Sequence, residues 1–353
     1  MLKSHFHKLA VIAALALVLI GSPAMAMSAA EAEAFEAEIG EAKSKMMGHS
    51  ASALEHARKA RLIAAGETTK ANKARLTARW LEAEALMRLN QATDAVGIIE
   101  EAVAETERSF AGSKLHADLL RSQASLNARK GAFATALPIF KQAQEIYGEL
   151  GEDRSRAIVL QNIGSLYSGA RLFEKALSYY QMAGEAYPGD PALALSAHNN
   201  TGNALKGLGR YQEAEIAFVL ALESAKPKNS PLLEARILTN IASAQVMGGK
   251  LDKAERTAAK AMDLAKQHAP EWARFVHGVM AQVALSRENW TSAEAHLARA
   301  FEGLDLTATA AHFREFHETA VRLFGQTDEA GTARLHRAAI ERLDAQVAKL
   351  ETI

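Results

Sequence analysis

The chain has 353 residues, of which 49% are apolar and 23% are charged, a balance typical of a globular protein long enough to bury a core. Its 41 lysines and arginines equal its 41 aspartates and glutamates, so no excess of one sign points to nucleic acid or to an anionic membrane as the partner. The chain has no cysteine, which excludes disulfides, thiolate metal sites and a lipidated cysteine after a leader.

Residues 1–26 have the pattern of a secretory signal peptide. Lys3 and Lys8 form a basic start, residues 9–20 are an unbroken apolar run, and residues 24–26 (Ala-Met-Ala) fit a cleavage site of small residues. The apolar run is too short to span a bilayer as an anchor. We therefore expect an exported protein, periplasmic or alternatively secreted, without stable membrane insertion after cleavage.

Residues 27–72 predict two helices that only loosely follow the pattern found further along the chain. Residues 29–47 are amphipathic and rich in glutamate, and residues 52–65 carry Ala53, Ala57 and Ala60 at the spacing of one helix face. We interpret this segment as a degenerate repeat that caps the N-terminal end.

Residues 73–305 contain six copies of a repeat whose starts are 41, 40, 38, 40 and 39 residues apart. The clearest copy carries, in order, Leu160, Ile163, Gly164, Tyr167, Ala176, Tyr180, Ala183 and Pro188. A small residue of a predicted first helix recurs at Ala83, Ala124, Gly164, Gly202, Ala242 and Ala281. Twelve residues after each comes an alanine of a predicted second helix, at Ala95, Ala136, Ala176, Ala214, Ala254 and Ala293. The turn between the two helices contains Asn90, Gly131, Arg171, Gly209, Gly249 or Glu288.

This pattern resembles the tetratricopeptide repeat, and its long period resembles the kinesin light chain type. The resemblance implies an all-α fold, a right-handed α-solenoid of antiparallel helix pairs with helical caps. Small residues allow the helices of one repeat to cross closely, and large residues fill the seam with the next repeat. Residues 306–353 fit a second degenerate repeat and a capping helix, with one helix expected over residues 308–324.

The sequence carries no motif for catalysis or for a cofactor. It has no phosphate-binding glycine loop with Lys-Ser or Lys-Thr, no His-Glu-x-x-His helix and no Gly-x-Ser-x-Gly elbow. His312 and His317 are five residues apart, on different faces of a helix, which disfavours a metal pair; His198 and His277 share one repeat position and are expected to be half-buried seam residues. We expect no enzyme, no catalytic residue, no cofactor and no metal, with an active site assembled across repeats as the least favoured reading.

Asparagines recur where no core role explains them. Asn162, Asn200 and Asn240 each stand two residues before the small residue of a first helix. The resemblance implies that this position faces the concave groove, where asparagines of the kinesin light chain type hydrogen-bond the backbone of an extended peptide. Alternatively, these amides could bond the backbone of the adjacent repeat and orient the stack.

The other residues expected to face the groove come from neighbouring template positions: Asn199, Asn203, Arg121, Gln161, Lys206 and Arg236. Basic residues outnumber acidic ones among them, which suggests a mild preference for an acidic or C-terminal carboxylate ligand. We predict a scaffold that binds an extended peptide segment of a partner protein. The alternative is an assembly component of a cell-envelope complex that docks through its convex face or its caps.

Overall fold

The computed structural model describes residues 26–64, 66–326 and 330–348, and the chain divides into two compact units, residues 1–126 and 127–353. The predicted signal peptide lies outside the described residues, apart from Ala26. In the described part of the chain, every regular element is a helix, and none of these helices is long and apolar enough to cross a membrane.

The first unit contains two helix pairs and most of a further helix. The pairs are α2 (Ala29–Lys45) with α3 (Ser50–Ile63) and α4 (Thr69–Arg88) with α5 (Ala92–Phe110), and the further helix is α6 (Lys114–Arg129). Ser28 caps α2 through a reciprocal hydrogen-bond pair with Glu31, the arrangement known as a capping box. Ala53, Ala57 and Ala60 of α3 are fully buried, as their spacing predicts.

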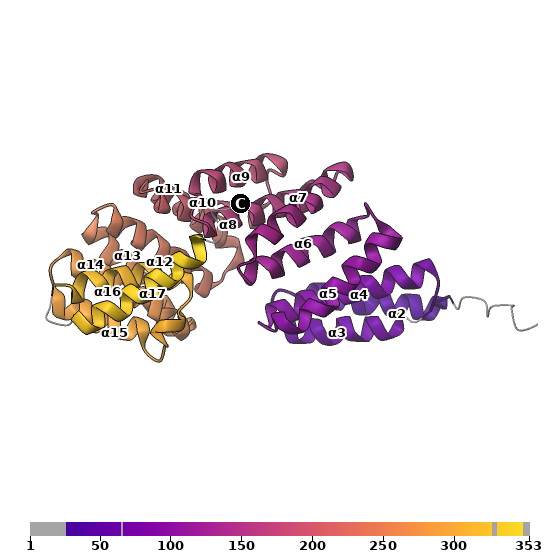
Figure 1. Ribbon diagram of the computed structural model, residues 1–353, viewed down its shortest axis with the longest axis horizontal. Coiled ribbons are helices and arrows are strands. Elements are labelled where there is room, and N and C mark those ends of the chain that lie inside the picture. The colour runs from indigo at the N-terminus through magenta and orange to yellow at the C-terminus, as the bar shows by residue number, and fades with distance from the viewer. Residues whose placement is uncertain (1–25, 65, 327–329, 349–353) are drawn as a thin grey trace, which may run out of the picture. The chain divides into compact units, whose positions relative to one another are not determined.

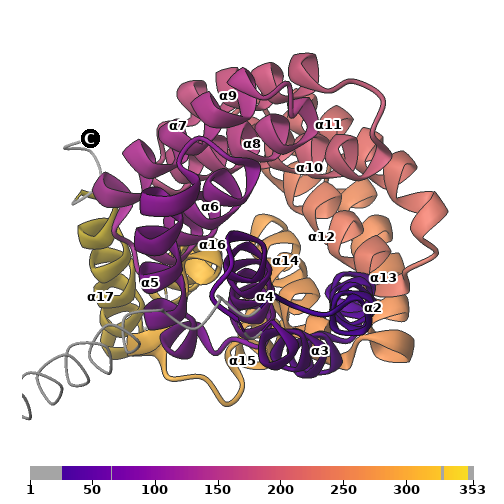
Figure 2. The same ribbon diagram turned by 90° about the vertical axis from the view of Figure 1, so that its right-hand side faces the viewer.

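The second unit continues the pairing (Figure 1). Its helices are α7 (Phe133–Glu149), α8 (Asp153–Gly169), α9 (Phe173–Ala186), α10 (Pro191–Gly207), α11 (Tyr211–Ala225), α12 (Pro231–Met247), α13 (Leu251–His268), α14 (Ala273–Ser286), α15 (Trp290–Phe301), α16 (Arg314–Phe324) and α17 (Ala330–Ala348). Within this unit, α8, α10 and α12 lie on the inner side of an arc, and α9, α11 and α13 lie on its outer side (Figure 2).

The repeated small residues lie at the crossings inside each helix pair. The ten alanines of the two repeated series are all fully buried, at 0% exposure. At the two glycine positions the partner helix supplies a ring: an added Cβ on Gly164 would lie 2.5 Å from Tyr180, and one on Gly202 would lie 2.6 Å from Phe218. The sequence pattern therefore marks the positions where two backbones approach most closely.

All six predicted inter-helix turns contain a residue with positive φ. Three are glycines, and the others are Asn90 at 62°, Arg171 at 59° and Glu288 at 58°. This left-handed conformation costs little at glycine and more at arginine or glutamate. All six turns therefore adopt the same left-handed conformation, even where the residue type disfavours it.

The C-terminal segment differs from the prediction at its first helix. Two short 3-10 turns, Leu306–Ala308 and Ala311–Phe313, replace the start of the helix that was expected over residues 308–324, so α16 begins at Arg314. The Asp305 carboxylate accepts the Thr307 N–H and caps the first turn, and extended backbone at Thr309 and Ala310 separates the two turns. This irregular stretch brings His312 and Glu315 to the inner side of the arc.

Two histidine pairs occupy equivalent places in the last two helix pairs. Nδ1 of His277 lies 3.0 Å from Nδ1 of His296, and Nδ1 of His317 lies 2.7 Å from Nδ1 of His336. In each pair the Nδ1 of one ring donates a hydrogen bond and the Nδ1 of the other accepts it. This hydrogen bond is lost if both rings of a pair are protonated. Burial lowers the pKa of both His317 and His336 to about 4, and the neighbouring His336 and Arg342 contribute at His317.

Gly202→Ala should destabilise the second unit, because its new Cβ would meet the buried Phe218 ring. The expected loss is about 1–2 kcal/mol, since overpacking costs more than the gain in helix propensity from removing a glycine. Thermal unfolding measures it against Gly184→Ala in α9, where an added Cβ meets nothing within 4 Å. Equal melting temperatures for the two variants would contradict the close crossing.

Acidification should weaken the C-terminal helix pair. His317 and His336 are buried in their neutral form, with pKa values of about 4 against 6.5 for an unperturbed histidine. Their contribution to stability is complete above pH 6.5 and falls as the pH drops from 6.5 towards 4, by about 3 kcal/mol for one such histidine. Urea unfolding followed by tryptophan fluorescence at pH 7 and pH 5 measures the first part of this loss, about 2 kcal/mol for one such histidine.

The matched variant for that experiment is His317→Gln with His336→Gln, which removes both titrating groups. Its unfolding free energy should change less between pH 7 and pH 5 than that of the unmodified protein. The same pH dependence in both proteins would show that this histidine pair does not control acid stability.

Candidate functional site

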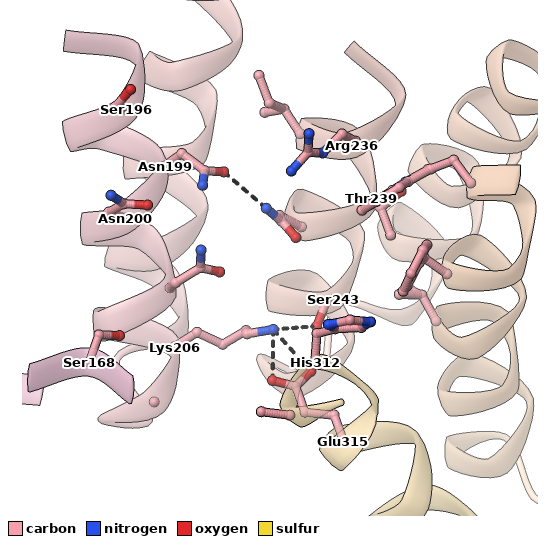
Figure 3. Close-up of a pocket in the computed structure, with 18 of the residues that line it drawn as sticks. Ser168, Ser196, Asn199, Asn200, Lys206, Arg236, Thr239, Ser243, His312 and Glu315 are labelled. Atoms are coloured by element: carbon pink, nitrogen blue, oxygen red, sulfur yellow. Dashed lines mark hydrogen bonds and ion pairs between the residues drawn. The ribbon is translucent and has the colours of Figure 1, made fainter. Parts of the chain in front are cut away.

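A cavity of about 830 Å³ opens on the inner side of the second unit, between the first helices of successive repeats. Helices α10 and α12 form its two long walls, and residues of α14, of the 3-10 turn at Ala311–Phe313 and of α16 close one end (Figure 3). Its volume falls in the range of ligand pockets, roughly 300–1,000 Å³.

Helix α10 presents one polar face to the cavity. Ser196, Asn199, Asn203 and Lys206 follow one another at intervals of three or four residues, which aligns them along one side of a helix. Asparagine is a weak helix former, but the Asp190 side chain accepts the N–H groups of Ala192 and Leu193 and fixes the start of α10. The cap and the packing of neighbouring repeats hold a helix that its own sequence favours only weakly.

Helix α12 supplies the facing wall with Arg236, Asn240 and Ser243. The Asn240 amide donates through Nδ2 to Oδ1 of Asn199, 3.0 Å away, so one hydrogen bond joins the two walls. The amides of Asn200 and Asn203 make no hydrogen bond with other described residues, although both line the cavity. Two side-chain amides, each able to donate and accept, therefore face open space.

Six of the nine residues predicted from the sequence line this one cavity: Asn199, Asn200, Asn203, Lys206, Arg236 and Asn240. Asn162 is half-buried and lies outside the cavity lining. The alternative, that these amides bond the backbone of the adjacent repeat, does not describe Asn240, because its hydrogen-bond partner is the side-chain amide of Asn199.

Two of the predicted residues, Gln161 and Arg121, do not line this cavity. Gln161 is buried in the seam, where its Nε2 donates to the backbone oxygen of Leu193, 3.0 Å away, and so ties α8 to α10. Arg121 belongs to the first unit, where its guanidinium lies 4.0 Å from Glu84. The repeat pattern alone does not distinguish an amide that bonds the neighbouring helix, such as that of Gln161, from an amide that faces the groove.

An ion pair crosses the cavity at the end formed by α16. The Lys206 ammonium lies 2.8 Å from Oε1 of Glu315 and also donates to Oγ of Ser243, 3.1 Å away. Burial, the largest influence, raises the pKa of Glu315, but the charge and hydrogen bond of Lys206 together with Ser243 and Arg314 outweigh it and leave the pKa below its ordinary value. Glu315 is therefore ionised at neutral pH.

Aromatic side chains gather at the other part of the lining, around Arg236. Its guanidinium lies 5.0 Å from the ring centre of Trp272, a cation–π contact, and Trp272 in turn lies 4.2 Å from Phe275. The Trp272 indole donates to Thr239 Oγ1, which fixes the ring. His312 lies 5.4 Å from Phe275, and burial lowers its pKa, so it is neutral at neutral pH.

The groove residues expected from the sequence do not include Trp272, His312 or Glu315, all of which line the cavity. Glu315 lies 109 residues from its partner Lys206 in the chain, and no repeat position relates the two. Trp272 lies in a 3-10 turn, Pro270–Trp272, outside the helical template. The only usable signal was composition, since tryptophan and histidine occur in the irregular stretches before α14 and α16, and the carboxylate lies in the first turn of α16.

This arrangement can bind but shows no group poised for chemistry. Its charged lining residues are Lys206, Arg236 and Glu315, and its remaining polar groups are amides, hydroxyls and a neutral imidazole. Among the residues that the structure describes, no group of three or more histidine, aspartate or glutamate side chains is arranged to hold a metal ion. Hydrogen bonding and charge pairing are the interactions it offers to a ligand.

Comparison with known proteins gives two kinds of similarity. Residues 115–189 and 195–227 match family models described as tetratricopeptide repeat. A 79-residue stretch is 34% identical to the mouse protein O-mannosyl-transferase TMTC3; it covers 22% of this chain and 8% of that protein, so this chain matches less than a tenth of that relative's length.

Several solved structures share the fold. A Rap protein complexed with competence and sporulation factor is 14% identical, with a TM-score of 0.63, and the match covers 90% of this chain and 99% of that one. NprR in complex with its cognate peptide NprX is 14% identical, with a TM-score of 0.59 and 88% of each chain covered. A repeat protein from Parabacteroides merdae ATCC 43184 is 18% identical, with a TM-score of 0.54, and the match covers 79% of this chain and 99% of that one.

Lys206→Met should destabilise the second unit by about 1–3 kcal/mol, because it leaves the Glu315 carboxylate in the cavity without its cation. Burial would then dominate and raise the pKa of Glu315 above its ordinary value. Relative to the unmodified protein at the same pH, the variant should consequently recover part of this loss as the pH falls towards 5 and the carboxylate takes up a proton. Thermal unfolding across this pH range measures the effect.

The double variant Lys206→Met with Glu315→Gln is the control for that prediction. It should be more stable at pH 7 than Lys206→Met alone, since the unpaired charge is gone. A double variant no more stable than the single one would mean that the two side chains are not energetically coupled.

Proposed function

We propose that the protein is a non-catalytic interaction scaffold that binds an extended peptide segment of a partner protein in the cavity between α10 and α12. The match of residues 115–189 and 195–227 to the tetratricopeptide repeat supports the scaffold role. The observation that carries this proposal is the row of cavity-facing amides. Asn200 and Asn203 have no hydrogen-bond partner in the described part of the chain, and Asn240 bonds only another amide.

A side-chain amide suits a peptide backbone because each can donate and accept at once. An extended peptide presents one N–H and one C=O per residue, and these groups must be satisfied when water is removed from them. Amides on one face of α10 and on the facing wall of α12 offer such partners without reading side chains. Affinity for a backbone would then come from the amides, and sequence preference from the charged and aromatic lining.

The structural neighbours support this proposal at the level of the fold. Two of them are complexes, one of a Rap protein with competence and sporulation factor and one of NprR with its cognate peptide NprX. At 14% identity these proteins share a scaffold with this chain, and scaffolds of this kind are reused with different ligands. The residues of this cavity, and not the likeness, carry the choice of ligand class.

Export is part of the proposal. The basic start, the apolar run and the small-residue site within residues 1–26 support cleavage after Ala26 and a mature chain that begins at Met27. The proposed place of action is the periplasm, with secretion as the alternative. The absence of cysteine fits a protein held together by packing alone.

A second candidate function is docking through the convex face, as an assembly component of an envelope complex. The observation that favours it is an apolar stripe on the outer helix α11, where Ile216, Val219 and Leu220 are 56%, 42% and 46% exposed. These residues are spaced by three and four positions and so share one face of the helix.

Replacing Asn200, Asn203 and Asn240 together by alanine should reduce peptide retention by about tenfold or more, since each lost amide removes a hydrogen bond worth about 1 kcal/mol. The measurement is affinity selection from a randomised heptapeptide library, with retained peptides quantified by mass spectrometry. The melting temperature should stay close to that of the unmodified protein, because the only bond lost within the fold is the one between Asn240 and Asn199.

Two matched variants separate the candidates. Asn162→Ala removes the repeat-equivalent amide outside the cavity lining and should leave retention unchanged, as should Ile216→Lys with Leu220→Lys on the convex face. Full retention by the triple asparagine variant would contradict the groove proposal. Loss of a partner complex only in the α11 variant would favour convex docking instead.

A further inference from the structure

The charges that line the cavity do not balance. The two cationic side chains, Lys206 and Arg236, face a single carboxylate, Glu315, and the one other titratable lining residue, His312, is uncharged at neutral pH. One positive charge, that of the exposed Arg236 side chain, is therefore left without a carboxylate among the residues that line the cavity.

Glu315 already fills the place of a ligand carboxylate at Lys206. It comes from α16, reaches the Lys206 ammonium at 2.8 and 2.9 Å with its two oxygens, and accepts the Ser243 hydroxyl at 3.3 Å. Lys206 is only 13% exposed, while 37% of the Glu315 side chain is accessible from the cavity. The protein thus neutralises one of its own cationic positions from within.

Arg236 is the second cationic side chain of the cavity, and it has no carboxylate partner in the part of the chain that the structure describes. Its guanidinium stacks on Trp272, whose indole is fixed by Thr239, and no carboxylate in the described ranges pairs with it. A guanidinium presents a planar fork of donors that matches the two oxygens of a carboxylate. Figure 3 shows the Asn199 amide across from Arg236 on the opposite wall, with the Lys206–Glu315 ion pair further along the same two walls, so a bound chain that reaches both cationic positions would pass the amides.

We propose that the cavity selects peptides with one carboxylate, which pairs with Arg236, and that Glu315 excludes a second carboxylate by occupying Lys206. This inference rests on the proposed function and specifies its ligand: an extended segment with a single negative charge at the Arg236 position. The charge comes from an acidic side chain or from the C-terminal carboxylate, which share the same chemistry. Glu315 is then a residue that determines specificity without belonging to the repeat pattern.

The geometry also fixes the spacing of the two positions. Arg236 and Ser243, which bonds Lys206, are seven residues apart on α12, a distance of about 10 Å along a helix axis. An extended peptide covers about 10 Å in three residues. If Glu315 lost its charge, the cavity should accept a second acidic residue about three positions from the first.

The test is affinity selection from randomised heptapeptides in two arms, one with amidated and one with free C-termini. For the unmodified protein we expect roughly fivefold enrichment of one acidic residue in the amidated arm, or of free-acid over amidated peptides if the carboxylate is C-terminal. Arg236→Gln should abolish this enrichment, and Glu315→Gln should add a second acidic preference about three positions away.

Control variants keep the outcomes distinct. Lys228→Gln removes an exposed lysine outside the cavity and should leave the enrichment unchanged, and Lys206→Met with Glu315→Gln should show the single acidic preference of the unmodified protein. Melting temperatures confirm that each variant is folded at the assay temperature.

Three results would overturn the inference: no acidic preference in the unmodified protein, a preference that survives Arg236→Gln, or two acidic preferences before Glu315 is changed. If Glu315→Gln adds no second preference, its role as internal carboxylate is wrong. Failure of the proposed function looks different, because the unmodified protein would then retain no more peptide than the triple asparagine variant.

Discussion

The close crossing inside each helix pair is the constraint on which the rest of the structure depends. Two short helices bury little surface by themselves, and they become stable only when small residues let them approach and the next pair covers their remaining apolar face. At Gly202 the partner ring of Phe218 occupies the space that a Cβ would need. Because this contact sets where α10 lies against α11, it also sets which face of α10 is left for the cavity.

That geometry explains why three asparagines are tolerated in α10. The sequence of α10 favours a helix only weakly, because it contains Asn199, Asn200, Gly202 and Asn203. Its helical conformation therefore depends on the Asp190 cap and on packing against neighbouring helices. Stability is supplied by the stack, so the inner face of the helix can carry side-chain amides although asparagine lowers its helix propensity. The same division of roles makes the outer helices α9, α11 and α13 structural supports for the inner ones.

The sequence predicts the positions of residues that recur in every repeat, but it does not predict contacts made by residues outside the repeat pattern. The crossing residues, the positive-φ turns and six of the nine groove residues follow from one template because each copy solves the same local packing problem. Gln161 does not face the cavity for a physical reason, since the repeat pattern fixes the direction in which a side chain points and not which group lies opposite it. Leu193 takes the amide of Gln161, and Arg121 falls in another compact unit.

Glu315 marks the limit of such reasoning. It reaches the cavity only because two 3-10 turns interrupt the start of the last helix pair, so that α16 begins at Arg314 and turns its first residues inward. A carboxylate placed there neutralises Lys206 at short range, in a site where burial alone would have raised its pKa. The departure from the repeat thus changes the charge of the groove by one unit, through a residue that lies on neither of the two long walls α10 and α12.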